Sequence, residues 1–162
     1  MHIWPLLQSV LLLAFANGAP VVAKKVLGTR LALPLDAGAR FFDGQPLLGP
    51  SKTIRGVVVS VGATAIVAPL FGLSLAAGAF VAVLAMIGDL FSSFVKRRLK
   101  FPSSSQAIGL DQVPESLLPL LVCKGALTLT FIDVVIGVGI FVLGEIILSR
   151  LLYDLRLRDE PY

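Results

Sequence analysis

The stretch GVVVSVGATAIVAPLFGLSLAAGAFVAVLAMIGDLFSSFV, residues 56–95, contains a single charged residue in 40 positions. One helix needs about 20 apolar residues to cross the hydrocarbon core of a bilayer, so this run is long enough for two. Pro69 and Gly72 lie near its middle and indicate a turn. We therefore predict a hairpin of two membrane-spanning helices, over residues 56–71 and 73–96, with both ends on the same side of the membrane.

The composition of the whole chain agrees with this hairpin. The 162 residues are 56% hydrophobic and 15% charged, whereas a soluble domain carries about 25% charged residues. Long apolar runs dominate over alternating patterns, which predicts an all-α integral membrane protein with one membrane domain, 1–162. The net charge of +4 does not indicate nucleic-acid binding, because the basic residues flank the apolar runs.

The counts of cysteine and histidine exclude several kinds of site. Cys123 and His2 are the only residues of their types. The chain therefore has no internal disulfide and no cysteine or histidine cluster for a metal, and Ser-His-Asp catalysis is implausible. A bound metal would be held by oxygen atoms, which favours Mg²⁺.

The first apolar run predicts a span over residues 3–23. A cleaved signal peptide is the alternative, but no Lys or Arg precedes the run, whereas Lys24 and Lys25 follow it. This order of charges favours a retained helix with its N-terminus outside the cell.

The last apolar run, residues 116–148, is long for one helix and short for two. Lys124 and Gly125 form its natural break. We therefore predict spans over 114–124 and 127–152. The first of these is short and contains Pro119, so a partial or re-entrant segment is the alternative.

The basic residues test the order of five spans. With five spans, 13 of the 14 Lys and Arg residues lie on one side and only Lys124 lies opposite. With four spans, the three cations of the C-terminal tail would lie outside. We therefore predict a multi-pass protein of the cell membrane with five helices, in which loops 24–55 and 97–113 and the C-terminus are cytoplasmic.

The segment GDLFSSFVKRR, residues 88–98, places chemically useful groups where a helix leaves the bilayer. A carboxylate, hydroxyls and cations of this segment share one helical face: Asp89, Ser92 or Ser93, Lys96 and Arg97. Such a face suits a metal ion and phosphates. The alternative is an ordinary positively charged helix end in which Asp89 is paired with a nearby cation.

The first loop ends in a second group of polar residues. Lys52, Thr53 and Arg55 directly precede the hairpin, where the amides of the helix start favour an anion. A flexible loop with interfacial cations is the alternative. A Walker-type phosphate loop is excluded, because Pro50 and Ser51 separate the last glycine from Lys52 and no apolar strand comes before the loop.

Four aspartates are candidate metal ligands. Asp89 is the strongest, because a carboxylate within a span is costly and usually functional. Asp111 follows the third span closely enough to fold back over its end. Asp36 and Asp43 are equally compatible with turns.

Three polar residues inside spans have open roles. Asn17 either reaches the polar site or bonds a neighbouring helix. Asp133 and Glu145 are interpreted as interfacial or interhelical structure, and they make a weak case for a proton path.

Four blocks in this order resemble the CDP-archaeol synthases, small membrane cytidylyltransferases that depend on CTP, and their bacterial relatives. The blocks are Asn17 with Pro20; LDAG, DG and GPSKTIRG between Leu35 and Gly56; GDLFSSFVKRR; and LDQ, Leu110 to Gln112. The first loop departs from the family at Ala37, Gln45 and Pro46. The motif cations are intact.

The resemblance implies a reaction in which a lipid phosphate attacks the α-phosphorus of CTP, giving a CDP-lipid and pyrophosphate with Mg²⁺. In archaeal members the acceptor is digeranylgeranylglyceryl phosphate. An ionised phosphate needs no nucleophilic side chain, so positioning and charge stabilisation are the expected means of catalysis.

From the resemblance and the residue chemistry we assign expected roles. The metal ligands are Asp89 with Asp111 or Asp36. The catalytic residues are Asp89, Lys52, Lys96 and Arg97. The substrate-binding residues are Asn17, Asp36, Gly38, Gly49, Thr53, Arg55, Gly56, Ser92, Ser93, Arg98 and Gln112.

Other functions fit the sequence less well. A transporter would carry polar residues through its spans, whereas here they gather at one face. A non-catalytic scaffold would not need Asp89, Lys52 and two serines in register. Within the enzyme class, a phosphatidate cytidylyltransferase making CDP-diacylglycerol is the alternative, because it differs only in the lipid tails.

Overall fold

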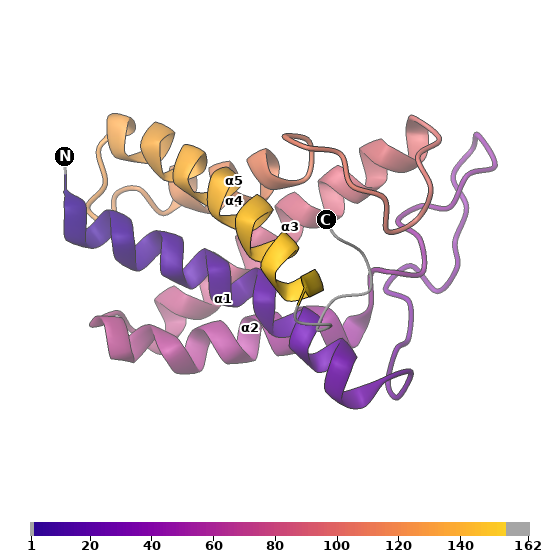
Figure 1. Ribbon diagram of the computed structural model, residues 1–162, viewed down its shortest axis with the longest axis horizontal. Coiled ribbons are helices and arrows are strands. Elements are labelled where there is room, and N and C mark those ends of the chain that lie inside the picture. The colour runs from indigo at the N-terminus through magenta and orange to yellow at the C-terminus, as the bar shows by residue number, and fades with distance from the viewer. Residues whose placement is uncertain (1, 155–162) are drawn as a thin grey trace.

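A computed structural model describes residues 2–154, and this part of the chain forms helices and connections without a β-strand. Five α-helices and one short 3-10 helix build it (Figure 1): α1 (Ile3–Leu27), α2 (Ile54–Val67), η1 (Ala68–Phe71), α3 (Leu75–Arg98), α4 (Gln112–Val122) and α5 (Phe131–Asp154). The prediction of an all-α fold is confirmed for the described residues. The cations of the C-terminal tail, Arg156 and Arg158, lie outside them.

The predicted helical hairpin is confirmed. The 3-10 helix η1 extends α2, and the chain then turns at Gly72, whose φ of 76° is left-handed and favours glycine. Ser74 caps the next helix by accepting a hydrogen bond from the amide of Ala77 at 3.1 Å. The polar turn thus separates two apolar helices that pack along each other.

The first helix is one turn longer than predicted. The expected end was residue 23, but α1 continues to Leu27 and includes Lys24 and Lys25 in its last turn. Two cations at this position are favourable, because the C-terminal end of a helix dipole attracts positive charge. The helix ends at Gly28, which has a φ of 55°.

Four helical segments are long and apolar enough to cross a membrane: Ile3–Leu27, Ile54–Phe71, Leu75–Arg98 and Phe131–Leu151. The remaining helix, α4, has only 11 residues. Its length is about 16 Å at 1.5 Å per residue, whereas the hydrocarbon core is about 30 Å thick. Five helices are therefore present, but α4 does not have the length of a full span, in agreement with the alternative of a partial segment.

The short helix α4 begins beside the middle of α3 and not at its end. A Cβ atom placed on Gly88 would lie 2.3 Å from the carbonyl oxygen of Pro114, so only glycine permits this close approach. The connection 99–111 folds back along the last turns of α3, where the Lys96 ammonium donates a hydrogen bond to the carbonyl oxygen of Ser105. The connection therefore packs against the last turns of α3, which the short helix α4 does not reach.

The opposite end of the bundle is fixed by Asp133. Its carboxylate accepts hydrogen bonds from the amide and hydroxyl of Thr130, at 2.9 and 2.8 Å, and from the amide of His2 at 3.2 Å. The start of α5 is thereby tied to the start of α1. The interpretation of Asp133 as interhelical structure is confirmed.

Candidate active site

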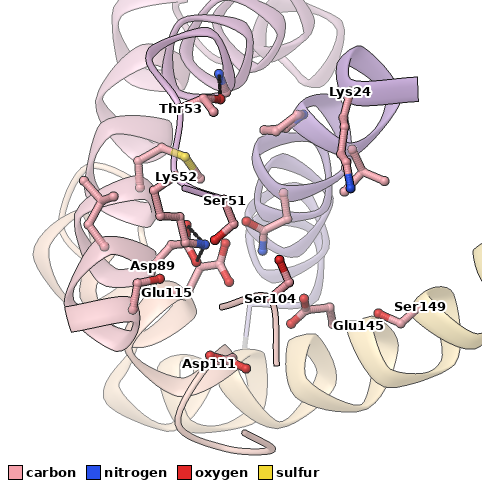
Figure 2. Close-up of a pocket in the computed structure, with 18 of the residues that line it drawn as sticks. Lys24, Ser51, Lys52, Thr53, Asp89, Ser104, Asp111, Glu115, Glu145 and Ser149 are labelled. Atoms are coloured by element: carbon pink, nitrogen blue, oxygen red, sulfur yellow. Dashed lines mark hydrogen bonds and ion pairs between the residues drawn. The ribbon is translucent and has the colours of Figure 1, made fainter. Parts of the chain in front are cut away.

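A cavity of about 990 Å³ opens between α1, α3, α4 and α5 and is closed on one side by the two long connections (Figure 2). This volume lies within the range of small-molecule sites. Largely apolar faces of α1 and α5 form part of its wall, interrupted by Lys24, Lys25 and Glu145. Most of the other charged side chains of the wall come from α3, α4 and the connections. The cavity therefore combines an apolar side with a charged side.

The pair of Lys52 and Asp89 lies at the centre of the charged side (Figure 2). The Lys52 ammonium lies 2.7 Å from each carboxylate oxygen of Asp89. Thr53 fixes the position of Lys52, because its hydroxyl caps α2 by accepting a hydrogen bond from the amide of Gly56. A residue of the first loop is thus held against the third helix.

The surroundings keep Lys52 charged. Burial lowers the pKa of Lys52, but the charge and hydrogen bonds of Asp89 raise it, and the charges of Glu115 and Asp111 add to this effect. The net result is a pKa above the usual value. A fixed positive charge therefore faces the cavity.

A second lysine–carboxylate pair lies on the same wall. The Lys96 ammonium is 2.6 Å from a carboxylate oxygen of Asp111, and the other oxygen accepts a hydrogen bond from the amide of Ala107 at 2.8 Å. Helix α3 and the start of α4 are thereby joined by a charged pair. Asp89 and Asp111, which we predicted as metal ligands, line one cavity together.

Glu115 is a cavity residue that our sequence analysis did not select. Its side chain lies beside Asp89 in Figure 2, and the residue is 4% exposed. The available signal was an acid in the first turn of a short apolar segment, where carboxylates are also common for their effect on the helix dipole. Because the helix dipole already explains an acid at this position, the sequence does not distinguish Glu115 as a third carboxylate of the site.

Several other predicted residues line the same cavity: Asn17, Thr53, Arg55, Gly56, Ser93, Arg97 and Gln112. The Nδ2 atom of Asn17 and the Nε atom of Arg97 are buried and have no hydrogen-bond partner among the residues that the structure describes. Buried donors without partners are costly, and a ligand with acceptor atoms would satisfy them.

Arg55 and Gln112 are already engaged within the protein. Arg55 donates to the carbonyl oxygen of Gly28 at 3.0 Å, and Gln112 accepts a hydrogen bond from the amide of Gly109 at 2.9 Å. They order the chain around the cavity, and their predicted contacts with substrate stay predictions.

Two predicted residues stabilise the first loop and do not line the cavity. The Asp36 carboxylate accepts hydrogen bonds from the amides of Leu48 and Gly49, at 2.9 and 3.1 Å, and from that of Gly38 at 3.0 Å. Burial raises the pKa of Asp36, but these amides lower it more, so its pKa lies below the usual value. The position of Asp36 fits the turn alternative and not a metal ligand beside Asp89.

Arg98 likewise holds the loop. Its guanidinium lies 4.7 Å from the ring centroid of Phe41 and 4.8 Å from that of Phe94, and it forms an ion pair with Asp43 at 3.1 Å. It also donates to the carbonyl oxygen of Pro46. Arg98 holds the loop against α3 and does not line the cavity. The phosphate contact that we predicted for it stays a prediction.

Ser92 and Ser93 are distinguished by the structure. Ser93 lines the cavity, whereas Ser92 is fully buried and donates to the carbonyl oxygen of Gly88 at 3.0 Å. Successive helical residues point about 100° apart, so only one of them can face the site. Gly38 and Gly49 also lie outside the cavity lining and serve the loop backbone, with φ angles of 78° and 97°.

The carboxylates of the cavity suit one kind of metal site. Across residues 2–154 there is no group of three or more His, Cys, Asp or Glu side chains arranged to hold an ion by themselves. Mg²⁺ is commonly bound by one or two carboxylates, with the remaining ligands supplied by phosphates and water. Asp89 and Asp111 fit that mode, in which a phosphate ligand completes the site.

This arrangement suits phosphate chemistry. Lys52, Lys96 and Arg97 supply positive charge in a partly buried cavity, where charged hydrogen bonds are stronger than in water. Among the described residues no histidine lines the cavity, and a reaction between two phosphates requires no nucleophilic side chain.

Comparisons with known proteins agree with this chemistry. Residues 71–162 match the family model described as CarS-like: CDP-archaeol synthase. A CDP-archaeol synthase of Hyperthermus butylicus is 38% identical over 135 residues, which are 75% of this chain and 77% of that protein. One of Pyrobaculum calidifontis is 34% identical over 152 residues, which are 91% of this chain and 90% of that protein.

A solved structure is similar throughout most of the fold. It is described as an intramembrane enzyme for archaeal membrane lipids biosynthesis, and it matches with a TM-score of 0.70 and 29% identity. The match covers 86% of this chain and 91% of that chain. With four apolar helices and this neighbour, the chain is a multi-pass membrane protein. On the family match and on these relatives, the chain belongs to the CarS-like family of CDP-archaeol synthases.

Proposed function

We propose that this protein transfers CMP from CTP to a lipid phosphate, such as digeranylgeranylglyceryl phosphate. An oxygen of the lipid phosphate attacks the α-phosphorus of CTP, the bond from that phosphorus to the bridging oxygen breaks, and pyrophosphate leaves. The products are a CDP-lipid and pyrophosphate. The relatives named CDP-archaeol synthase support this class of reaction.

The observation that carries the proposal is the presence of two lysine–carboxylate pairs, Lys52 with Asp89 and Lys96 with Asp111, in one cavity between membrane helices. Two anions must approach each other in this reaction, and their repulsion is the main obstacle. Fixed cations lower that obstacle by binding both phosphates in the reacting geometry.

The roles of the residues follow from their places on the wall. Lys52, Lys96 and Arg97 would bind the phosphates of CTP and of the lipid. Asp89 and Asp111 would hold Mg²⁺, which when bound supplies further positive charge at the triphosphate. Binding of a nucleotide would move each lysine from its carboxylate onto a phosphate, which leaves the carboxylates available to Mg²⁺.

The apolar part of the cavity wall suits a lipid acceptor. Apolar side chains of α1 and α5, among them Val10, Ala14 and Ile140, line the same space as the lysines. A lipid phosphate would place its charged head group at the lysines and its tails along apolar helices. We propose that this end of the bundle is cytoplasmic, because the flanking Lys and Arg residues gather there.

The test is pyrophosphate release by detergent-purified protein with CTP and Mg²⁺. Digeranylgeranylglyceryl phosphate and phosphatidate are compared as acceptors, because both present a phosphate monoester but differ in their tails and in the linkage of the tails to glycerol. We expect release that needs both CTP and lipid, stops with EDTA, and is faster with the ether lipid. Faster release with phosphatidate would identify a CDP-diacylglycerol synthase instead.

In the same assay Asp89→Asn should lose most of the release, and its matched control is Asp43→Asn, which changes a carboxylate outside the cavity lining. If neither lipid gave pyrophosphate with folded protein that binds CTP, the proposed transfer would be wrong for these acceptors. If CTP also failed to bind, a non-catalytic scaffold would be the better description.

A further inference from the structure

Two of the cations that we assign to phosphates are covered by the chain that follows α3. The Lys96 side chain is 9% exposed and the residue Arg97 is 5% exposed, whereas the Lys52 side chain is 23% exposed. The cavity therefore presents one cation to a ligand directly and keeps two others covered. We call the segment that covers them, residues 99–106, the strap.

The strap is held down by these same two cations. The Lys96 ammonium donates a hydrogen bond to the carbonyl oxygen of Ser105 at 2.8 Å, and the Arg97 guanidinium donates to that of Pro102 at 2.8 Å. Hydrogen bonds from charged donors are stronger than those between neutral groups. The groups that hold the strap in place are thus the groups that a phosphate would bind.

The strap also reaches across to the first loop. The Ser103 hydroxyl donates to the Ser51 hydroxyl at 3.4 Å, and both residues line the cavity. Figure 2 shows Ser51 and Ser104 beside the space that the pair of Lys52 and Asp89 faces. The strap therefore runs from the end of α3 to the residue before Lys52 and closes one side of the cavity.

The closed strap carries two costs. Lys100 and Ser104 have φ angles of 60° and 64°, a left-handed conformation that is uncommon for residues other than glycine. The Oγ atom of Ser105 is buried and has no hydrogen-bond partner among residues 2–154. Both costs are removed when the segment leaves this position, so an open arrangement lies within reach.

A phosphate competes with the strap for the same donors. To contact Lys96 or Arg97 it must take the place of the Ser105 or Pro102 carbonyl, because both cations are covered on the side of the strap. A phosphate oxygen carries charge and is the stronger acceptor for a cation. The exchange of a carbonyl for a phosphate is therefore favourable.

From these contacts, and resting on the proposed binding of CTP, we infer that the strap is a gate over the phosphate-binding cations. It is closed in the ligand-free protein and opens when the phosphates of CTP take over the hydrogen bonds of Lys96 and Arg97. The affinity for CTP is then reduced by the fraction of molecules in which the gate is closed. The strap acts on entry of the nucleotide and takes no part in the bond-breaking step.

A designed disulfide tests whether the strap must move. The variant carries Ser51→Cys and Ser103→Cys in a Cys123→Ala background, because Cys123 is the chain's only cysteine. The two hydroxyl oxygens lie 3.4 Å apart, so cysteines at these positions need only a small adjustment to form the bond. Binding of CTP with Mg²⁺ is measured on detergent-purified protein without lipid, before and after reduction.

We expect the oxidised variant to bind CTP at least tenfold more slowly and more weakly than the reduced variant, with full recovery on reduction. The two single-cysteine variants, treated with the same oxidant, are the controls and should bind like the reduced protein. Equal binding by the oxidised and reduced forms would overturn the gate.

Pro102→Gly tests the gate in the opposite direction and adds no bulk to the cavity. It keeps the backbone carbonyl that Arg97 bonds, but it gives the released strap more conformational freedom and so favours opening. We expect CTP to associate roughly two- to fivefold faster. Unchanged or slower association would overturn the gate, and a slow oxidised variant would then show only that the disulfide blocks the cavity.

Hydrogen exchange follows the strap in the wild type and does not need the disulfide to form. Amides of residues 99–106 should exchange faster with CTP and Mg²⁺ than without them, while the preceding turns of α3 stay protected. Slower exchange of the strap with CTP would mean that it closes onto the nucleotide, which contradicts the gate.

These outcomes are separate from the transfer reaction. If CTP opens the strap but no pyrophosphate is released with lipid, the proposed function fails and the gate stands. If lipid-dependent release occurs and the oxidised variant binds CTP normally, the gate fails and the proposed function stands. If CTP does not bind to the wild type, both fail.

Discussion

The Lys52 ammonium lies 2.7 Å from both carboxylate oxygens of Asp89, although the two residues are 37 positions apart. One belongs to the loop before α2 and the other to the last half of α3. The contact therefore closes the first loop over the cavity and, at the same time, places the strongest candidate metal ligand beside a fixed cation. Both side chains are about one-fifth exposed, which leaves them accessible to a ligand from the cavity.

The first prediction concerns this pair. Asp89→Asn should lower the rate of pyrophosphate release about 10²- to 10³-fold, the usual cost of losing one electrostatic contact in the transition state. The protein should stay folded, because asparagine still accepts a hydrogen bond from Lys52. Steady-state kinetics and the thermal midpoint in detergent measure the two effects.

A double variant checks that the two residues act together. Lys52→Met combined with Asp89→Asn should be little worse than the poorer single variant, because groups that act as a unit are strongly non-additive. Fully multiplicative losses would show that the lysine and the aspartate contribute separately.

The second prediction separates two neighbouring arginines. Arg98→Met removes the contacts of the guanidinium with Phe41, Phe94 and Asp43 and should weaken the loop by roughly 1–2 kcal/mol. Faster hydrogen exchange of the amides in residues 36–49 would report this loosening.

Arg97→Met is the matched control for that experiment. Arg97 lines the cavity and donates to the carbonyl oxygen of Pro102. Its loss should weaken CTP binding without faster exchange in the first loop. If Arg98→Met lowered CTP affinity at unchanged exchange, Arg98 would contact phosphate directly, as the sequence had indicated.

The third prediction concerns the crossing of α3 and α4. Gly88→Ala should destabilise the protein by at least about 1–3 kcal/mol, because its Cβ would lie 2.3 Å from the Pro114 carbonyl oxygen and 2.7 Å from the Cα of Glu115. Gly62→Ala, where a Cβ meets nothing within 4 Å, is the control and should leave the thermal midpoint unchanged. Equal midpoints for the two variants would argue against the close contact.

The fourth prediction is a dependence on pH at Asp36. The pKa of this carboxyl group is lower in the folded loop than its ordinary value of 3.8, so its stabilising effect is complete above that value and is lost as the pH falls through the lower folded pKa. Protection of the Leu48 and Gly49 amides should therefore decrease in that acid range. Asp36→Asn should remove the acid transition and lower protection at neutral pH.

Much of the fold was predicted from local patterns alone. The hairpin of α2 and α3 was located to within two residues at most of its ends, because apolar runs of spanning length and the turn at Gly72 are local signals. The predicted end of α1 lies four residues too early, because Lys24 and Lys25 end the apolar run but not the helix. The start of α5 was placed four residues too early, because the turn after α4 is itself apolar.

The site was predicted as a set of residue types, and its geometry was not. Asp89, Lys52, Lys96 and Asp111 were selected from chemistry and from their order along the chain. That Lys52 pairs with Asp89, and that Ser93 rather than Ser92 faces the cavity, depends on the rotation of α3 within the bundle, and a single sequence does not specify that rotation.

An α-helical membrane protein with its polar chemistry gathered at one end follows from local sequence alone, because the lengths of the apolar runs and the positions of the charges are read residue by residue. Which polar groups serve the cavity and which serve the loop depends on how the helices pack. Asp36 and Arg98 are held by backbone amides, carbonyls and aromatic rings of the first loop and of α3. Glu115 reaches the cavity because α4 packs closely on Gly88, and Glu145 reaches it because α5 packs on α1 and α4. Such long-range contacts have no local signature.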